Sequence, residues 1–371
     1  MTVVGTRPEI IRLSRCIAQL DQHTEHVLVH TGQNFDYELN EVFFEQLSIR
    51  KPDHFLGAAG ETPAETIGQV IAKVDAVLAA ELPDAMLILG DTNSCLAAIA
   101  AKRRKVPIFH MEAGNRCFDF RVPEEINRRI VDHTADINLP YSQIARDYLL
   151  REGFPPDQVI VTGSPMREVL DHYRPGIESS EALQRLSLQA QKYFVVSAHR
   201  EENVDAPGRL RQLLAVVNAL AKDHGLPVIV STHPRTRKRL EAMGEVQVDP
   251  LVQFMKPFGF LDYVQLQRQA RAVLSDSGTI TEESNILNFP ALNLRDVHER
   301  PEGFEEAAVM MVGLDVDRVR DGLRILATQP SGNERLLYEV HDYSANNVSH
   351  KVLRIIQSYT GFVNRKVWHK G

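Results

Sequence analysis

Acidic side chains follow short apolar runs in the first half of this 371-residue chain. Asp91 and Glu112 each stand just after such a run, and Glu124 stands in the first turn of a predicted helix. Carboxylates serve as general acids and bases, so such a group is typical of proton-transfer chemistry. Each also has an ordinary structural explanation, because Asp91 could cap the next helix and a first-turn acid interacts with the helix dipole.

The second half carries groups that bind anions. His199 and His233 each follow an apolar run and each stands close to an arginine, and Arg300 ends a basic loop. The turn at 275–278 is built of small residues before a predicted helix, so it presents unpaired backbone N–H groups. We expect a phosphate-bearing ligand there; the alternative is an ordinary βαβ unit with a charged surface loop. The first half of the chain therefore offers carboxylates and the second half offers anion-binding groups. This division suits a ligand in which a diphosphate is joined to a sugar that reacts.

The elements that must position these residues alternate between strands and amphipathic helices. Such alternation predicts parallel sheets covered by helices on both faces, and ligands bind such sheets at the carboxyl ends of the strands. The pattern weakens from 166 to about 192, which we interpret as a linker. Predicted strands in the first half lie at 1–5, 26–32, 85–91, 107–114, 137–140 and 159–165, with helices at 6–20, 63–80, 93–105, 123–135 and 141–153.

Bulk properties exclude several classes of protein. The length favours two domains, and the net charge of −7 with a pI near 6.1 argues against general nucleic-acid binding.

No apolar run is long enough for a membrane span and no secretory signal is visible, so we expect a cytoplasmic protein. The three cysteines have no CxxC spacing, which suits a reducing compartment and argues against a zinc site. GxGxxG, GxxxxGK[ST], HExxH and GxSxG are absent, which disfavours dinucleotide enzymes, P-loop NTPases, zincins and serine hydrolases.

Several motifs together resemble the non-hydrolysing UDP-N-acetylglucosamine 2-epimerases along nearly the whole chain. The matching segments are GTRPEII (5–11), TGQN (31–34), LGDTNS (89–94), HMEAGNR (110–116), RVPEEINRRIVDH (121–133), SAHREEN (197–203), STHPRTRK (231–238), SDSGTITEES (275–284) and RDVHERPEG (295–303). Within the family, segments 118–153 and 354–368 are similar to the subgroup that makes UDP-N-acetyl-L-fucosamine for capsule and O-antigen.

The resemblance implies an α/β fold of two Rossmann-like, doubly wound domains facing across a cleft, in the glycosyltransferase-B arrangement. We expect domains at 1–166 and 167–348, with a C-terminal helix at 349–371 that returns to the first domain. The family precedent is a homodimer. The partners implied are a UDP-N-acetylhexosamine and UDP, and no metal or redox cofactor is required.

The resemblance also implies roles for individual residues. The catalytic candidates match the family's carboxylates and the histidine of its H-R-[RE]-E segment: Asp91, Glu112, Glu124 and His199. The substrate-binding candidates lie in the matching segments of both halves: Arg7, Asn127, Arg128, His233, Ser277, Gly278, Glu283 and Arg300. Of these, Ser277, Gly278 and Glu283 should hold the diphosphate and ribose, and Arg300 should neutralise the departing UDP.

The chain departs from the family pattern at three places. It has Arg12 where epimerases acting on UDP-N-acetylglucosamine commonly have lysine, and its loop at 117–122 is shorter than theirs. Asn34 replaces a histidine that belongs to an allosteric substrate site in bacterial relatives. The loop borders the sugar in the family, so its length bears on which UDP-sugar is the substrate, and Asn34 argues against activation by substrate. The similarity to the subgroup favours UDP-2-acetamido-2,6-dideoxy-L-talose as substrate, with UDP-N-acetylglucosamine as the alternative.

The implied reaction is inversion at C2 by elimination of UDP to a 2-acetamidoglycal, followed by re-addition. A glycosyltransferase of the same architecture is a competing interpretation, and it would need an open acceptor site. A hydrolysing epimerase would release free sugar and UDP. A nucleotide-sugar sensor would bind without turnover and is expected to lack one of the carboxylates, whereas Asp91, Glu112 and Glu124 are all present.

Overall fold

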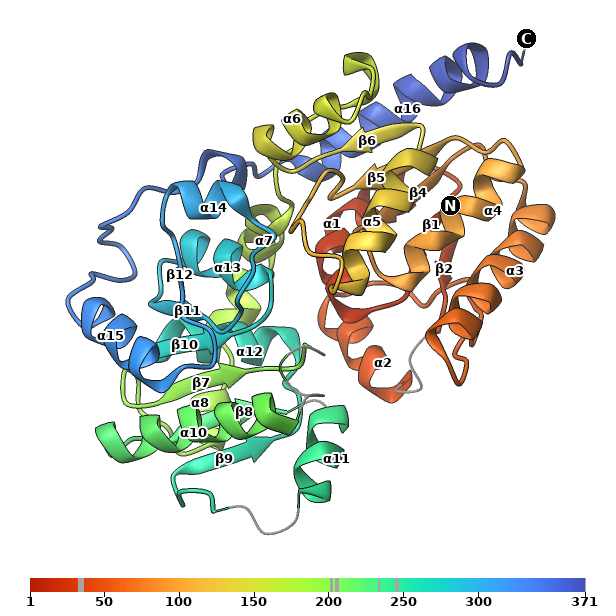
Figure 1. Ribbon diagram of the computed structural model, residues 1–371. Coiled ribbons are helices and arrows are strands. Elements are labelled where there is room, and N and C mark those ends of the chain that lie inside the picture. Colours follow the sequence, from red (N-terminus) through yellow and green to blue (C-terminus); the bar gives the residue numbers. More distant parts are fainter. Residues whose placement is uncertain (33–36, 201–202, 204–206, 233, 244–246, 371) are drawn as a thin grey trace. The chain divides into compact units, whose positions relative to one another are not determined.

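The computed structural model describes residues 1–32, 37–200, 203, 207–232, 234–243 and 247–370. The chain forms two compact units (Figure 1). Unit 1 comprises Met1–His172 and His341–Gly371, and unit 2 comprises Tyr173–Val340. The junctions differ from the expected 166 and 348, because helix α7 (Met166–Glu178) continues past residue 166 and Ser164 N–H already bonds to Asp342 O.

Unit 1 is built around a six-stranded sheet in the order β3-β2-β1-β4-β5-β6, and every pair of neighbours is parallel. This order reverses between β1 and β4, as in the dinucleotide-binding fold. The strands are β1 (Thr2–Val4), β2 (Leu28–His30), β3 (His54–Phe55), β4 (Met86–Leu89), β5 (Ile108–Met111) and β6 (Ile137–Leu139). The helices are α1 (Arg7–His23), α2 (Tyr37–Gln46), α3 (Pro63–Glu81), α4 (Ala98–Arg103), α5 (Pro123–Thr134), α6 (Gln143–Arg151), α7 and α16 (Val348–Lys366), with short 3₁₀ turns η1 (Asn93–Ala97), η2 (Pro156–Gln158) and η3 (His341–Tyr343).

Unit 2 repeats the same plan with the order β12-β11-β10-β7-β8-β9. The order reverses between β7 and β10, and all neighbours are again parallel. The strands are β7 (Phe194–Ser197), β8 (Val228–Ser231), β9 (Val252–Met255), β10 (Ala272–Ser275), β11 (Ala291–Asn293) and β12 (Met310–Met311). The helices are α8 (Ala182–Arg185), α10 (Pro207–His224), α11 (Pro234–Ala242), α12 (Phe260–Gln269), α13 (Thr279–Leu287), α14 (Pro301–Glu305) and α15 (Val316–Leu326). The predicted α/β class with two Rossmann-like domains is confirmed.

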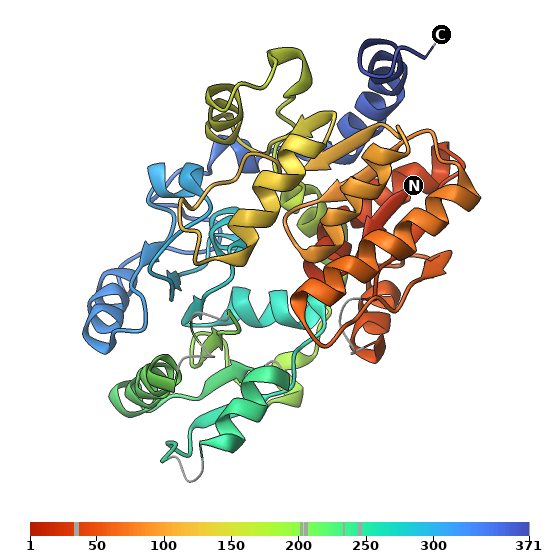
Figure 2. The same cartoon turned by 45° about the vertical axis from the view of Figure 1, so that its right-hand side comes forward.

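Alternation along the strands explains the layers of unit 2. Phe194 and Val196 of β7 point to a core formed with α10 and α15, whereas Val195 points to a second core formed with α8, α12 and α13. Successive side chains of a strand face opposite sides of a sheet, so an unbroken apolar run needs helices on both faces. Figures 1 and 2 show these helices on the two sides of the sheet.

In unit 1, one face of the sheet packs on α3, η1, α4 and α5 through an apolar cluster that includes Val74, Ile88 and Ala97. On α1, the buried positions include Ile10, Leu13 and Ile17. Helix α16 packs against α1, so the chain's last helix belongs to the same unit as its first (Figure 1).

One local prediction is wrong. Residues 159–165 do not form a strand, because only Val159 bridges to Asn138 and Gly163 turns the backbone with a φ of +84°. The segment expected as a linker, 166–192, contains α7 and α8, and the first junction between the units, at His172–Tyr173, lies within it. Helix α7 tolerates Pro175 three residues before its last residue. In the described part of the chain, no helix combines the length and apolar character needed to cross a bilayer.

Candidate active site

The reversal of strand order in unit 1 brings two candidate turns together. Strands β1 and β4 are neighbours, so the turn that carries Arg7 and the turn that carries Asp91 leave the same edge of the sheet. In open parallel sheets this point is where ligands bind. Arg7 lies half-buried, with its guanidinium over the ring of Phe43 at 5.7 Å from the centroid.

Glu9 joins these two turns. Its Oε2 accepts the N–H groups of Gly5 and Thr6 at 2.6 and 2.7 Å, and its Oε1 accepts the hydroxyls of Thr92 and Ser94, each at 2.6 Å. Glu9 is 2% exposed, so these bonds form in a site that water hardly reaches. A buried carboxylate with four donors fixes both turns relative to each other.

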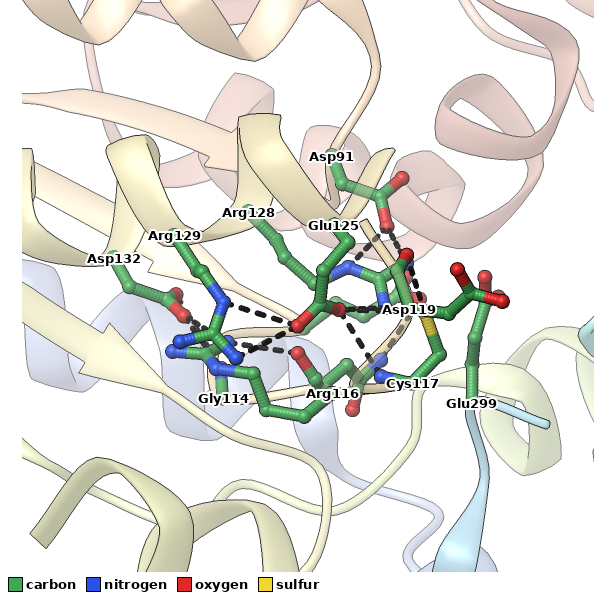
Figure 3. Close-up of polar contacts among 12 residues, drawn as sticks. Asp91, Gly114, Arg116, Cys117, Asp119, Glu125, Arg128, Arg129, Asp132 and Glu299 are labelled. Carbon is green, nitrogen blue, oxygen red and sulfur yellow. Dashed lines mark hydrogen bonds and ion pairs between the residues drawn. The ribbon is translucent and has the colours of Figure 1, made fainter. Parts of the chain in front are cut away.

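Asp91 is held from helix α5. Its Oδ2 accepts Nη2 and Nε of Arg128 at 2.6 and 3.1 Å (Figure 3). The side-chain amide of Asn127 donates to the backbone carbonyl of Asp91 at 3.0 Å. Asn127 and Arg128, predicted to bind substrate, therefore bind the Asp91 turn in this structure.

Glu112 lies beside the same turn. It has a φ of +64°, a backbone conformation that non-glycine residues adopt only when their surroundings impose it. Its carboxylate forms an ion pair with Arg12 and accepts a hydrogen bond from Asn115 Nδ2 at 3.2 Å. A Cβ placed on Gly90 would lie 3.7 Å from Glu112 Oε2. The structure thus brings together the Asp91 turn and the Glu112 carboxylate, and Arg12 lies beside them through its ion pair with Glu112.

The two acids at the start of α5 differ in environment. Glu124 is half-buried in the first turn of the helix. Glu125 is completely buried and pairs with Arg129 at 2.9 Å and Arg128 at 3.2 Å, and it accepts the N–H of Cys117 at 3.0 Å (Figure 3). Glu125 therefore ties the loop at 117–122 to the helix that holds Asp91.

A second buried group of charges lies behind these turns. His110 Nδ1 is 2.9 Å from Asp132 Oδ1, and Asp132 Oδ2 accepts Arg116 Nη1 at 2.7 Å. Burial lowers the pKa of His110, but Asp132, the Gly90 carbonyl and Asp91 together raise it by more, so its pKa lies above the ordinary value. Burial raises the pKa of Asp132, but His110 and Arg116 lower it by more, so its pKa lies below the ordinary value.

In unit 2, His199 follows β7 and Asp276 follows β10, the two strands at which that sheet reverses. Asp276 is fully buried, and its Oδ2 accepts the N–H groups of His199 and Arg200 and the amide of Asn203 at 2.9 to 3.1 Å. The His199 ring is half-exposed, with Nδ1 3.3 Å from Asp276 Oδ1. The predicted His199 is thus held by a carboxylate that sequence reasoning overlooked.

The other residues predicted to bind UDP in unit 2 lie in α13 or contact it. Ser277 Oγ and Thr279 Oγ1 are 2.9 Å apart, and Gly278 is the residue that precedes the helix. Glu283 is buried and accepts Gln267 Nε2 at 2.7 Å. Arg300 is also buried, and its Nε donates to Glu282 at 2.8 Å. His233 and Asn34 lie outside the described residues.

Within the ranges that the structure describes, no three His, Cys, Asp or Glu side chains converge in a way that could hold a metal ion. The groups that gather at the unit 1 site are carboxylates, guanidinium groups and amides. They can move protons and bind polar groups, which is the chemistry that the carboxylate pattern predicts.

Comparison with known proteins assigns the chain to a family. The family model described as UDP-N-acetylglucosamine 2-epimerase matches residues 18–357. The chain belongs to this family. It is therefore an isomerase, a UDP-sugar 2-epimerase.

Individual members of the family agree with this assignment. The solved structure of UDP-N-acetylglucosamine 2-epimerase from Rickettsia bellii is 50% identical, covers 100% of this chain and 99% of its own, and superposes with a TM-score of 0.92. The Methanocaldococcus jannaschii enzyme in complex with UDP-GlcNAc and UDP is 30% identical, with coverage of 96% and 99% and a TM-score of 0.89. A curated relative from Pseudomonas aeruginosa, UDP-2,3-diacetamido-2,3-dideoxy-D-glucuronate 2-epimerase, is 35% identical over 87% of this chain and 91% of its own length.

Gly114, which follows the Glu112 turn of this epimerase, allows a test of how tightly that turn is packed. Its φ is +80°, and an added Cβ would lie 2.4 Å from the backbone oxygen of Ala145 in α6. Gly114→Ala is expected to lower the free energy of unfolding by more than Gly153→Ala, where φ is +94° but no atom lies within 4 Å. The control should show only the backbone cost, about 1–2 kcal/mol. The free energy of unfolding of both variants can be measured by urea unfolding, followed by the fluorescence of Trp368 in unit 1, the only tryptophan. An equal loss of stability in the two variants would contradict close packing at Gly114.

Sequence reasoning overlooked the buried residues that hold the turns, namely Glu9, His110, Arg116, Glu125 and Asp132. Part of the signal is present, because Glu125, Arg128, Arg129 and Asp132 recur at spacings of three, four and seven and so share one side of α5. Such a stripe is normally interpreted as a solvent-exposed face. In this epimerase Glu125, Arg128 and Asp132 are buried and the Arg129 side chain is 31% exposed, whereas the apolar Ile126 and Ile130 are 46% and 40% exposed.

Proposed function

We propose that this epimerase inverts C2 of a UDP-N-acetylhexosamine by eliminating UDP and adding it back. The C2 hydrogen is not acidic, since no carbonyl adjoins that carbon, so direct deprotonation and reprotonation is implausible. In the proposed reaction a base takes the C2 proton, the C1–C2 double bond forms, and the C1–O bond to UDP breaks. An acid then protonates C2 on the other face and UDP adds back to C1.

The observation that carries the proposal is the grouping of Glu112 and the Asp91 turn at the strand reversal of unit 1. The ion pair with Arg12 presents Glu112 as a carboxylate, the form that a general base requires. Asp91 and Glu124 are the other proposed proton carriers. Asn127 and Arg128 are proposed to act near the substrate while holding Asp91.

The residues proposed for UDP lie in unit 2, together with Arg7 of unit 1. Ser277, Gly278 and the N-terminus of α13 offer hydroxyl and N–H donors for a diphosphate. His199 and Arg300 would offset the charge that develops on UDP as it leaves. Glu283 is proposed to contact the ribose, and His233 is proposed for the diphosphate region from its sequence position alone.

For the substrate, we favour UDP-2-acetamido-2,6-dideoxy-L-talose, converted to UDP-N-acetyl-L-fucosamine for capsule or O-antigen. The similarity of segments 118–153 and 354–368 to the subgroup supports this choice. The short loop at 117–122 and Arg12, where the chain departs from enzymes acting on UDP-N-acetylglucosamine, contact the helix that holds Asp91 and Glu112, respectively. UDP-N-acetylglucosamine, giving UDP-N-acetylmannosamine, is the second candidate, supported by the substrate named for the R. bellii and M. jannaschii enzymes. The P. aeruginosa relative carries the name of a different UDP-sugar, so family membership alone does not select one. The homodimer known in the family is part of this proposal.

Incubation with each UDP-sugar in D2O, followed by proton NMR, tests the substrate and the mechanism together. We expect the L-talose derivative to give UDP-N-acetyl-L-fucosamine with deuterium at C2. A product that keeps its C2 hydrogen would contradict elimination and re-addition. Turnover of UDP-N-acetylglucosamine alone would select the second candidate, and free sugar with UDP would indicate hydrolysis.

A further inference from the structure

The His110 side chain lies at one end of a buried chain of charges of alternating sign. His110 on β5 contacts Asp132 on α5, Asp132 contacts Arg116, and Arg116 contacts Glu152 at the end of α6 through Nη2–Oε2 and Nε–Oε1 distances of 2.6 and 2.8 Å. His110, Asp132 and the Arg116 side chain are fully buried. Charges so placed are stable only when each has a partner.

The hydrogen bond of Nε2 and the ion pair of Nδ1 determine the protonation state of His110. Nε2 is 2.7 Å from the carbonyl oxygen of Gly90, which can only accept, so Nε2 must carry a proton. Nδ1 faces Asp132 Oδ1 at 2.9 Å. The other oxygen of Asp132 accepts from Arg116, and the carboxylate also receives the N–H of Gly114 at 3.2 Å, so Asp132 acts as an ionised acceptor. Nδ1 therefore carries a proton as well, and the ring is an imidazolium.

The two ends of this arrangement reach the turns that carry Asp91 and Glu112. Gly90 directly precedes Asp91, and Gly114 follows Glu112 by two residues. Gly90, Glu112 and Gly114 all have positive φ, at +81°, +64° and +80°. Backbone in this region is retained only where surrounding contacts hold it. The hydrogen bonds from His110 to Gly90 and from Gly114 to Asp132 supply such contacts.

We propose that protonated His110, paired with Asp132, is a positioning residue that holds the Asp91 and Glu112 turns in their working geometry. The inference rests on the proposed function, because the roles of those two carboxylates belong to it. The charged groups that bear on the ring are Asp132 from α5 and Asp91 from the turn after β4, and both favour the imidazolium. Arg116, from the loop after β5, contacts Asp132 on the far side.

The protonation state can be measured without turnover. In protein labelled with ¹⁵N-histidine, long-range proton–nitrogen NMR should show both His110 nitrogens protonated at pH 7, with the signals assigned by their loss in His110→Gln. His26 is the control, because burial lowers its pKa despite its hydrogen bond to Asp21, so it should be neutral at that pH. A neutral His110 ring at pH 7 would overturn the proposal.

The effect on the reaction is tested with Asp132→Asn, which keeps the shape of the side chain and removes its charge. Without that charge the His110 pKa should fall, so the alkaline decline of kcat should move to lower pH by about one unit or more, with KM little changed. A merely structural role would lower kcat by the same factor at every pH, and that result would overturn the proposal. Activity after Glu112→Gln reports separately on the proposed function, because it leaves the NMR result for His110 unaffected.

Stability gives a third readout with a defined sign. The folded pKa of His110 is raised, so its contribution is fully present below its unfolded pKa of about 6.5 and is lost as pH rises through the folded pKa. The difference in unfolding midpoint between wild type and His110→Gln should therefore be largest at pH 6 and below and shrink as pH rises. A difference that grows with pH would contradict a charged His110.

Discussion

Glu112→Gln is expected to lower kcat by about 10³-fold, within the range that a positioned acid or base contributes. Glutamine keeps the shape and the hydrogen bond from Asn115 but cannot take a proton from C2. The residues proposed for UDP lie mainly in unit 2, so UDP binding, measured by isothermal titration, should persist. Far-UV circular dichroism should remain that of the wild type, because one side chain changes on a rigid sheet edge.

A matched control separates this effect from the general loss of a carboxylate. Glu81→Gln at the end of α3 removes a partly exposed acid that pairs with His54, and kcat should not change. Loss of turnover in Glu112→Gln alone would fit a role in proton transfer. If the variant retained kcat within twofold of wild type, Glu112 would have no part in the chemistry.

The fold could be predicted because the relevant signals are local. Apolar runs such as the first three residues of β7, 194–196, are buried on both faces, and that pattern needs only the sequence of one strand. The wrong strand at 159–165 shows the limit, since an apolar run becomes a strand only where a neighbour offers a complete ladder. Val159 meets one partner residue on β6, and Gly163 then takes the chain toward Asp342. The conformation of this segment depends on residues far away in the sequence, and the local sequence pattern carries no information about them.

The candidate site could be predicted where residues follow strands, because topology places strand ends together. Asp91 and Glu112 are found this way, through β4 and β5, which are adjacent. The buried charged residues that hold Asp91 and Glu112 in place could not be predicted, because the burial of a charge depends on partners far along the chain. Arg116 meets Glu152, and Glu9 meets Ser94, and neither pairing has a sequence period. Helix α5 even suggests the opposite orientation, because its apolar Ile126 and Ile130 are exposed whereas its Glu125, Arg128 and Asp132 are buried.

The buried charges have a shared physical consequence. The turn residues at positive φ are strained, and α5 supplies partners on its buried side: Arg128 for Asp91, Asp132 for Gly114 and His110, and Glu125 for the loop at 117–122. One helix therefore holds both carboxylate turns and the adjoining loop. An ion-pair network of this kind adds little net stability over an apolar core, but its partial removal is costly.

Arg116→Met is expected to lower the free energy of unfolding by about 3–5 kcal/mol, the cost of leaving a buried charge without its partner. Methionine fills part of the volume but leaves the fully buried Asp132 with His110 as its charged partner, and it leaves Glu152 without its two bonds from Arg116. Arg116 Nη1 also donates to Asn115 O at 2.7 Å, so the Glu112 turn should loosen as well. Urea unfolding followed by Trp368 fluorescence reports the change in unit 1.

Two further variants identify the cause of that loss. Arg104→Met in the same unit breaks an exposed pair with Asp75 of similar geometry, with Nε–Oδ1 and Nη2–Oδ2 distances of 2.5 and 2.7 Å, and the midpoint should not move. Adding Asp132→Asn to Arg116→Met removes the charge left without its partner, so the double variant should lose less stability than the sum of the two single variants. Additive losses would mean that packing around Arg116, rather than its charge, stabilises the turns. A non-additive result would show that Asp132 and Arg116 act as one unit, which is what a shared partner of two strained turns requires.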